Sequence, residues 1–169
     1  MILTIFSSIL HVSNNLTILY LSYLILKETH MLRPFHLALP TLNLSKTIDY
    51  YINTLGCKLG RSDTTWADFN FYGHQVVFHE YSSFTMPSIQ NCVDSKQVHV
   101  PHFGIVLTID DWELLKQKLL RVNHSFIIEP YTRFKGTNGE QSTMFFLDNN
   151  GYAVEIKALA DDRLLFRPF

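Results

Sequence analysis

The sequence is short of several features that would point to particular classes of protein. It has only two cysteines, Cys57 and Cys92, which form neither a disulfide framework nor a Cys-x-x-Cys metal motif. Its 14 basic and 15 acidic side chains nearly cancel, with no basic stripe and no acidic tail. We therefore expect no nucleic-acid partner, and the scarcity of cysteine favours a reducing, cytoplasmic location.

Charge is also absent before Lys27, and this part of the chain differs from the rest of the sequence. Its second apolar run, 16–26, has eleven residues, about half of what a bilayer span needs. A secretory signal would have a basic start and a small-residue cleavage site, and both are missing. Three interpretations stay open: an upstream extension before a natural start at Met31, which we favour, a membrane anchor, or a signal. A membrane is an expected partner only if residues 1–30 are retained as an anchor.

The sequence does have a high content of apolar and aromatic side chains. Hydrophobic residues make up 47% of the 169 positions, which fits a folded domain or two small halves that share a core. Aromatic residues make up 14%, including 13 Phe and 8 Tyr. They would either fill the core or line a cavity, and we favour the core.

From Pro34 onward, the same order of strand and helix patterns occurs twice. Residues 34–81 predict β-α-β-β-β, and residues 101–159 predict β-α-β-β-β again. The polar segment between them, 82–100, is interpreted as a linker or a lid, and residues 160–169 form a C-terminal tail. The predicted class is α+β, with two tandem modules related by an internal repeat.

Three predicted strands each carry one metal-binding side chain on the face away from their aliphatic residues. These side chains are His36, His102 and Glu155, and each has a small residue beside it on that face. Under the repeat, His36 matches His102, whereas Glu155 matches the apolar Val77, so the set has three ligands. Two histidines and one carboxylate form the facial set of non-haem Fe(II) sites. The alternative is that each is an ordinary hydrogen-bonded strand residue.

Two polar side chains share the predicted face of Val77. Gln75 and His79 could supply a fourth ligand, a hydrogen-bond partner for a ligand, or a substrate contact. His79 is also a candidate catalytic acid or base, because an imidazole titrates near neutral pH. The alternative for His79 is a structural polar residue.

A polar, glycine-bearing segment, 131–141, is predicted to be a loop before the penultimate strand. Tyr131 is a candidate catalytic residue, and Arg133 and Lys135 are candidates for holding an anionic substrate. An ordinary solvated loop is the alternative.

Several stretches resemble the vicinal oxygen chelate superfamily, which includes glyoxalase I, type I extradiol dioxygenases, fosfomycin-resistance enzymes and bleomycin-binding proteins. Within it, the chain is most similar to bacterial glyoxalase-like proteins described as predicted extradiol dioxygenases. The stretches cover most of residues 34–159: PFHLALP, YYINTLGC, DFNFYGHQVVFH, VPHFGIVL, IEPYTRFKG and EQSTMFFLDNNGYAVEIKA.

The resemblance implies two βαβββ modules that form a curved sheet around a shared cavity, with a divalent metal held by His36, His102 and Glu155. It implies Fe(II) or Mn(II), with Zn or Ni as alternatives, and an extradiol-type dioxygenase acting on a small aromatic diol. Many glyoxalase-type members have a carboxylate where this chain has Val77, a departure that weakens the interpretation as a glyoxalase-like isomerase or lyase. A metal-free protein that sequesters a drug-like molecule is the third interpretation.

The C-terminal tail, 160–169, is expected to pack on the sheet or on a second subunit, and the sequence leaves a homodimer as an open alternative. Its apolar residues are Leu164, Leu165, Phe166 and Phe169.

Overall fold

The computed structural model describes residues 33–85, 89–93 and 95–167. The predicted N-terminal extension, residues 1–30, lies outside these ranges. Among the residues described, no helix is both long enough and apolar enough to cross a bilayer.

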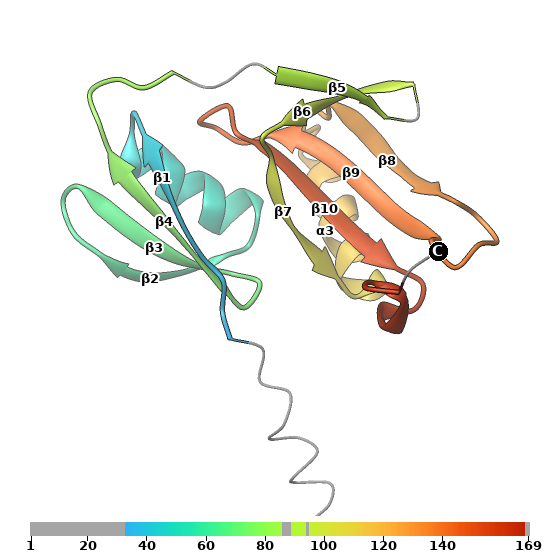
Figure 1. Cartoon of the computed structure of the whole chain (residues 1–169). Helices are drawn as coiled ribbons and strands as arrows, with labels where there is room; N and C mark the ends of the chain where they lie inside the picture. Colours follow the sequence, from blue (N-terminus) through green and yellow to red (C-terminus); the bar gives the residue numbers. More distant parts are fainter. Residues whose placement is uncertain (1–32, 86–88, 94, 168–169) are drawn as a thin grey trace, which may run out of the picture. The chain divides into compact units, whose positions relative to one another are not determined.

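Two four-stranded mixed sheets form the framework, and both have the same topology (Figure 1). The first has the order β1-β4-β3-β2 and contains β1 (His36–Thr41), β2 (Lys58–Ser62), β3 (Trp66–Phe71) and β4 (His74–Glu80). The second has the order β7-β10-β9-β8 and contains β7 (Phe103–Leu107), β8 (Ile128–Arg133), β9 (Gln141–Leu147) and β10 (Ala153–Leu159). In each sheet the strands that come first and last along the chain, β1 with β4 and β7 with β10, pair in parallel. The other neighbouring strands pair antiparallel. This confirms the predicted α+β class and the paired βαβββ modules.

Each module places its helix against one face of its sheet (Figure 1). In the first module, α2 (Leu44–Asp49) continues directly into the wider helical turn η1 (Tyr50–Thr54), and the side chain of Asn43 caps its first turn. In the second, α3 (Ile109–Arg121) begins after Thr108, whose hydroxyl accepts from the Asp111 backbone N–H. The opposite face of each sheet carries the predicted ligands.

The segment interpreted as a linker contains regular structure that its sequence pattern did not predict. Strands β5 (Ile89–Val93) and β6 (Lys96–Val100) pair as an antiparallel hairpin within it. A lid function for this segment stays a prediction. The C-terminal tail contains a short 3₁₀ helix, η2 (Asp162–Leu164), which contacts β10.

Many of the aromatic residues that the structure describes belong to the core between the helices and the sheets. The largest fully buried side chains include Tyr51, Phe69, Phe78 and Phe146. Rings also meet between the modules, because the Phe78 and Tyr152 centroids lie 6.2 Å apart. Aromatic pairs at such spacings add to the free energy of apolar burial.

A polar junction also connects the first module's helix to the β9–β10 turn. The hydroxyl of the fully buried Tyr51 donates to Asp148 Oδ2 at 2.9 Å, and Asp148 Oδ1 accepts from the Asn150 and Tyr152 backbone N–H groups, each at 2.8 Å. Burial raises the pKa of Asp148 above its ordinary value, while these hydrogen bonds oppose the shift. The hydroxyl of Thr41 donates to Asn150 Oδ1 at 2.7 Å, so the turn is held by several donors of the first module.

We expect Tyr51→Phe to lower the free energy of unfolding by about 1–3 kcal/mol, because it removes a donor from a buried carboxylate. The pKa of Asp148 is higher in the folded state than in the unfolded chain, where it is about 4. Its contribution to the free energy of unfolding therefore decreases as the pH rises from about 4 through the folded-state pKa. Without the Tyr51 hydroxyl the pKa rises further, so the loss should be larger at pH 7 than at pH 4. Urea unfolding at both pH values measures it.

The control is Tyr81→Phe, since Tyr81 is 59% exposed. Equal stability of both variants at pH 7 would contradict the role given to the junction.

Candidate metal centre

The pairing of β7 with β10 brings two of the three predicted ligands together. Glu155 lies opposite Gly104, and His102 directly precedes β7 on the same side of the sheet. His102 Nε2 lies 3.4 Å from Glu155 Oε2, and the imidazole packs edge-on against Phe145 with a centroid separation of 5.1 Å.

The orientation of the His102 ring is fixed by a backbone carbonyl three residues earlier in the chain. Its Nδ1 lies 2.6 Å from the His99 carbonyl oxygen, which can only accept, so Nδ1 must carry the proton. In the neutral ring the lone pair is then on Nε2, the atom that faces Glu155. A bare imidazole nitrogen beside a carboxylate oxygen is an arrangement that a shared cation stabilises.

The carboxylate of Glu155 is buried, with a relative exposure of 6%. Its Oε1 accepts from the Thr143 hydroxyl at 2.8 Å, and its Oε2 lies 3.0 Å from Lys157 Nζ. His102, Gly104, Glu155 and Lys157 together line part of a cavity of ≈270 Å³. The cavity therefore combines a carboxylate, an imidazole and an ammonium group.

The spacing of the His102–Glu155 pair is compatible with metal coordination. If both atoms lay about 2.1 Å from one ion, their 3.4 Å separation would correspond to an angle of roughly 110° at the ion. Two neighbouring ligands can take this angle, and imidazole with carboxylate suits Zn, Fe and Mn. The pair thus fits two positions of a divalent metal site.

The third predicted ligand lies on the other sheet. His36 is exposed and faces Gln75 across the β1–β4 pairing, and Ala38 faces Val77. This register makes Val77 the structural counterpart of Glu155, in agreement with the alignment of the repeats. His36 Nδ1 is 2.8 Å from Gln75 Oε1.

The three predicted ligands do not converge within a single chain. Over residues 33–85, 89–93 and 95–167, no group of three His, Cys, Asp or Glu side chains is placed to hold one metal ion. The ligand set of His36, His102 and Glu155 therefore stays a prediction, of which the structure assembles the pair His102 and Glu155.

The other predicted site residues are spread over several elements. His79 is exposed on β4 and is aligned with Trp66 of β3. Tyr131 and Arg133 belong to β8 rather than to a loop, because their pairing with Thr143 and Gln141 extends that strand. The loop prediction was wrong for these two residues: polar side chains on an outer strand resemble those of a loop.

The surroundings of the β8 residues are cationic and aromatic. Lys96 Nζ lies 5.0 Å from the centroid of the Tyr131 ring, and the Arg133 guanidinium carbon lies 4.4 Å from that of Phe134. Lys135 is exposed in the following loop. The structure thus keeps Lys135 available to solvent and gives Tyr131 a cation–π partner.

The sequence alone led to no role for Lys157 or Asp68. Lys157 lies two positions after Glu155, so strand alternation alone places it on the ligand's face. Asp68 lies opposite Val77, and the available signal was an acidic side chain between the apolar residues Ala67 and Phe69.

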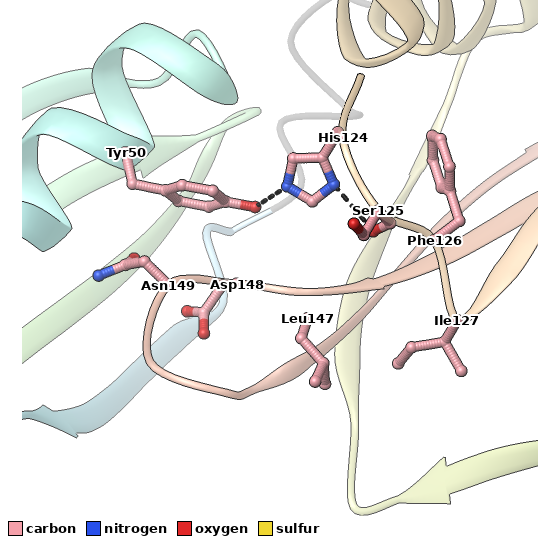
Figure 2. A pocket seen from close by; sticks show the side chains of 8 residues that line it. All are labelled: Tyr50, His124, Ser125, Phe126, Ile127, Leu147, Asp148 and Asn149. Atoms are coloured by element: carbon pink, nitrogen blue, oxygen red, sulfur yellow. Dashed lines mark hydrogen bonds between the residues drawn. The ribbon is translucent and has the colours of Figure 1, made fainter. Parts of the chain in front are cut away.

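A second and larger cavity, of ≈480 Å³, lies among residues of η1, the segment after α3, and the β9–β10 turn (Figure 2). The Tyr50 hydroxyl and His124 Nε2 are 2.8 Å apart, and His124 Nδ1 is 3.0 Å from the Ser125 carbonyl oxygen. That carbonyl can only accept, so Tyr50 donates to His124, and burial raises the pKa of the Tyr50 phenol. The lining residues include none of the predicted ligands, and the Tyr50–His124 bond joins the two modules.

Comparison with known proteins supports the fold. No protein-family model matches the sequence, and no match was found among curated proteins. A glyoxalase/bleomycin resistance protein/dioxygenase from Alicyclobacillus acidocaldarius is 28% identical, with a TM-score of 0.64 over 79% of this chain and 96% of its own. The fosfomycin resistance protein FosX from Listeria monocytogenes is 14% identical, with a TM-score of 0.57 over 80% and 98%. A glyoxylase/bleomycin resistance protein/dioxygenase domain from Frankia is 17% identical, with a TM-score of 0.55 over 79% and 96%.

These structures have the vicinal oxygen chelate fold, and this chain has it too. The resemblance identified in the sequence is thereby confirmed at the level of the superfamily.

Gly104 allows β7 to approach the backbone of Glu155, because a Cβ at this position would collide with the Glu155 carbonyl oxygen. We expect Gly104→Ala to lower the free energy of unfolding by about 1–3 kcal/mol, as added volume does at a tightly packed site. Amide hydrogen exchange around Glu155 should become faster as β7 is displaced.

The matched control is Ala38→Gly, at the equivalent position of the first module. It should cost about 0.5–1 kcal/mol through chain flexibility and leave exchange in β10 unchanged. A Gly104→Ala variant with wild-type stability and exchange would refute the close approach.

Proposed function

We propose that this protein is a metal-dependent enzyme of the vicinal oxygen chelate type, an extradiol-type dioxygenase that acts on a small aromatic diol. The observation that carries the proposal is the His102–Glu155 pair. Its Nε2 and Oε2 atoms are 3.4 Å apart, while His102 Nδ1 and Glu155 Oε1 are bound by the protein. Two candidate ligand atoms therefore lie side by side, and Lys157 Nζ is the other group near Oε2, at 3.0 Å.

His36, His102 and Glu155 would hold Fe(II) or Mn(II). The bound ion would supply a Lewis acid that binds two adjacent substrate oxygens and leaves a coordination position open. Zn or Ni would suit a glyoxalase-like isomerase or lyase instead, in which a proton moves next to a carbonyl.

We further propose that a second copy of the chain completes the site. His36 and Ala38 of β1 are exposed, as are His102 and Gly104 at β7. A two-fold contact that places β1 of one copy over β7 of the other would bring His36 to the His102–Glu155 pair twice, once at each site. The exposed ligand-bearing faces support this homodimer.

The residues around the pair suit a small diol that loses a proton on binding. The Lys157 ammonium group, 3.0 Å from Glu155 Oε2, would attract the resulting oxyanion. Next to His102, an apolar cavity of ≈150 Å³ is lined by Leu37, Phe103 and Tyr152 among others. A cavity of about 150 Å³ can hold a benzene ring.

The remaining predicted residues keep their proposed roles. His79 and Tyr131 are candidates for proton transfer, and Arg133 and Lys135 for holding substrate charge. The expected location is cytoplasmic.

The first test is metal analysis of the full-length wild type beside Glu155→Gln. We expect about one equivalent of iron or manganese per chain in the wild type and its loss in the variant, because a facial triad needs its carboxylate. Glu129→Gln is the control, since Glu129 is an exposed carboxylate of β8. Oxygen uptake with catechol should then follow metal content.

Other outcomes change the conclusion. One equivalent of zinc or nickel without oxygen uptake would favour the isomerase or lyase. A wild type that takes up no metal after incubation with Fe(II) would rule out the enzyme as proposed and favour a binding protein in which Lys157 balances the charge of Glu155.

A mixing experiment tests the shared site. We expect His36→Ala and Glu155→Ala to bind little metal alone, whereas subunits mixed by unfolding and refolding should recover about one quarter of the wild-type metal. Random assortment makes half of the dimers mixed, and each mixed dimer has one intact site. If mixing recovers no metal although the variants form dimers, the ligands come from one chain.

A further inference from the structure

A chain of polar contacts extends from His36 into the buried part of the first sheet. His36 Nδ1 lies 2.8 Å from Gln75 Oε1, and Gln75 Nε2 donates to Asp68 Oδ2 at 3.0 Å. Asp68 in turn accepts from the Arg61 backbone N–H and from Arg61 Nε, the latter at 3.2 Å. The three side chains of Asp68, Gln75 and His36 thus form a relay from the interior to the surface.

The direction of every hydrogen bond in this relay is set by Asp68. A carboxylate only accepts, so Gln75 must present its NH₂ group to Asp68 and its carbonyl oxygen to His36. That oxygen also only accepts, so His36 Nδ1 must carry the proton. The neutral imidazole then has its lone pair on Nε2, the nitrogen left for a metal ion.

Asp68 itself is firmly held. Its relative exposure is 6%, and the Arg61 guanidinium group balances its charge. Gly60 makes room for it, because a Cβ there would overlap Asp68 Oδ1. Three other residues therefore serve this one buried carboxylate: Gly60, Arg61 and Gln75.

The repeat shows that the fold does not require this carboxylate. Asp68 lies opposite Val77, and the equivalent residue opposite Glu155 is Phe145. Gln75 likewise corresponds to Ala153, since each lies two residues before the Val77 or Glu155 position. Burying a carboxylate costs folding free energy, and the second module has an apolar residue at the same position. The presence of Asp68 therefore needs an explanation other than the stability of the fold.

Both predicted histidine ligands have the proton on Nδ1, but different groups hold it there. His102 obtains its acceptor from the His99 backbone carbonyl, whereas His36 depends on side chains. Hydrogen bonds of this kind orient metal-binding histidines and raise their affinity for the ion.

We propose that Asp68 is a positioning residue for the metal site: through Gln75 it fixes His36 as the Nδ1–H tautomer and leaves Nε2 for the metal. The metal-binding part of this inference rests on the proposed function, whereas the tautomer can be tested without metal. It also assigns Gln75 to orienting His36 rather than to binding substrate.

The test uses ¹⁵N NMR of the metal-free full-length protein at pH 8, where an ordinary imidazole is neutral. The His36 signal, assigned by its loss in His36→Gln, should show Nδ1–H in the wild type. In Asp68→Asn a single amide oxygen replaces the two carboxylate oxygens that accept from Arg61 and Gln75. The Gln75 amide is then free to flip and present its NH₂ group to His36. The His36 tautomer should therefore shift toward Nε2–H. Asp148→Asn, which changes a buried aspartate of the other module, should leave the His36 tautomer unchanged.

A second variant covers the case in which Asp68→Asn does not fold. Gln75→Met removes the acceptor from His36 and leaves the Arg61–Asp68 ion pair in place, so it should also abolish the preference for Nδ1–H. A wild-type His36 in the Nε2–H form, or a variant that keeps Nδ1–H, would overturn the proposal.

Titration with Co²⁺ separates this inference from the proposed function. Asp68→Asn and Gln75→Met should each weaken Co²⁺ binding by about 10–100-fold, as loss of such partners does at other metal sites. If the tautomer shifts as expected while Co²⁺ binding is unchanged, the relay is confirmed and His36 is not a ligand. If the wild type binds no Co²⁺ but has the expected tautomer, the relay stands and the proposed metal site fails.

Discussion

The parallel pairing of the first and last strands in each module is the constraint on which the rest of the site depends. It places Gly104 beside Glu155 in one module and Ala38 beside Val77 in the other. A shift by one residue would turn Glu155 into the core and Ile156 toward the ligands, because strand side chains alternate between faces. The aliphatic residues on the helix side therefore fix the register, and the register determines which face of the sheet the predicted ligands occupy.

Strand alternation and the internal repeat were sufficient to predict the fold. The alternation of His36 and His102 with aliphatic neighbours assigned both histidines to the face away from the core, and the structure places them there. The turn at Asp148–Gly151 likewise consists of residues that favour turns. These features depend on local sequence and on one repeated pattern, which a single chain displays.

The features that could not be predicted depend on tertiary contacts. Polar residues of β8 resembled a loop because an outer strand needs few apolar side chains, and the β5–β6 hairpin was hidden in a polar segment. The relay from Asp68 to His36 joins positions that come together only when β3, β4 and β1 pair. The meeting of all three predicted ligands, as proposed above, would need a subunit contact, and the order of residues in one chain does not encode such a contact locally.

The junction at Asp148 also bears on how the protein unfolds. The Asp148 carboxylate belongs to the second module. It accepts a hydrogen bond from the Tyr51 hydroxyl, which belongs to the helical segment of the first module. Separating the modules would break the Tyr51–Asp148 hydrogen bond and would expose the rings of Phe78 and Tyr152 to water. We therefore expect the two modules to unfold together, as one cooperative unit.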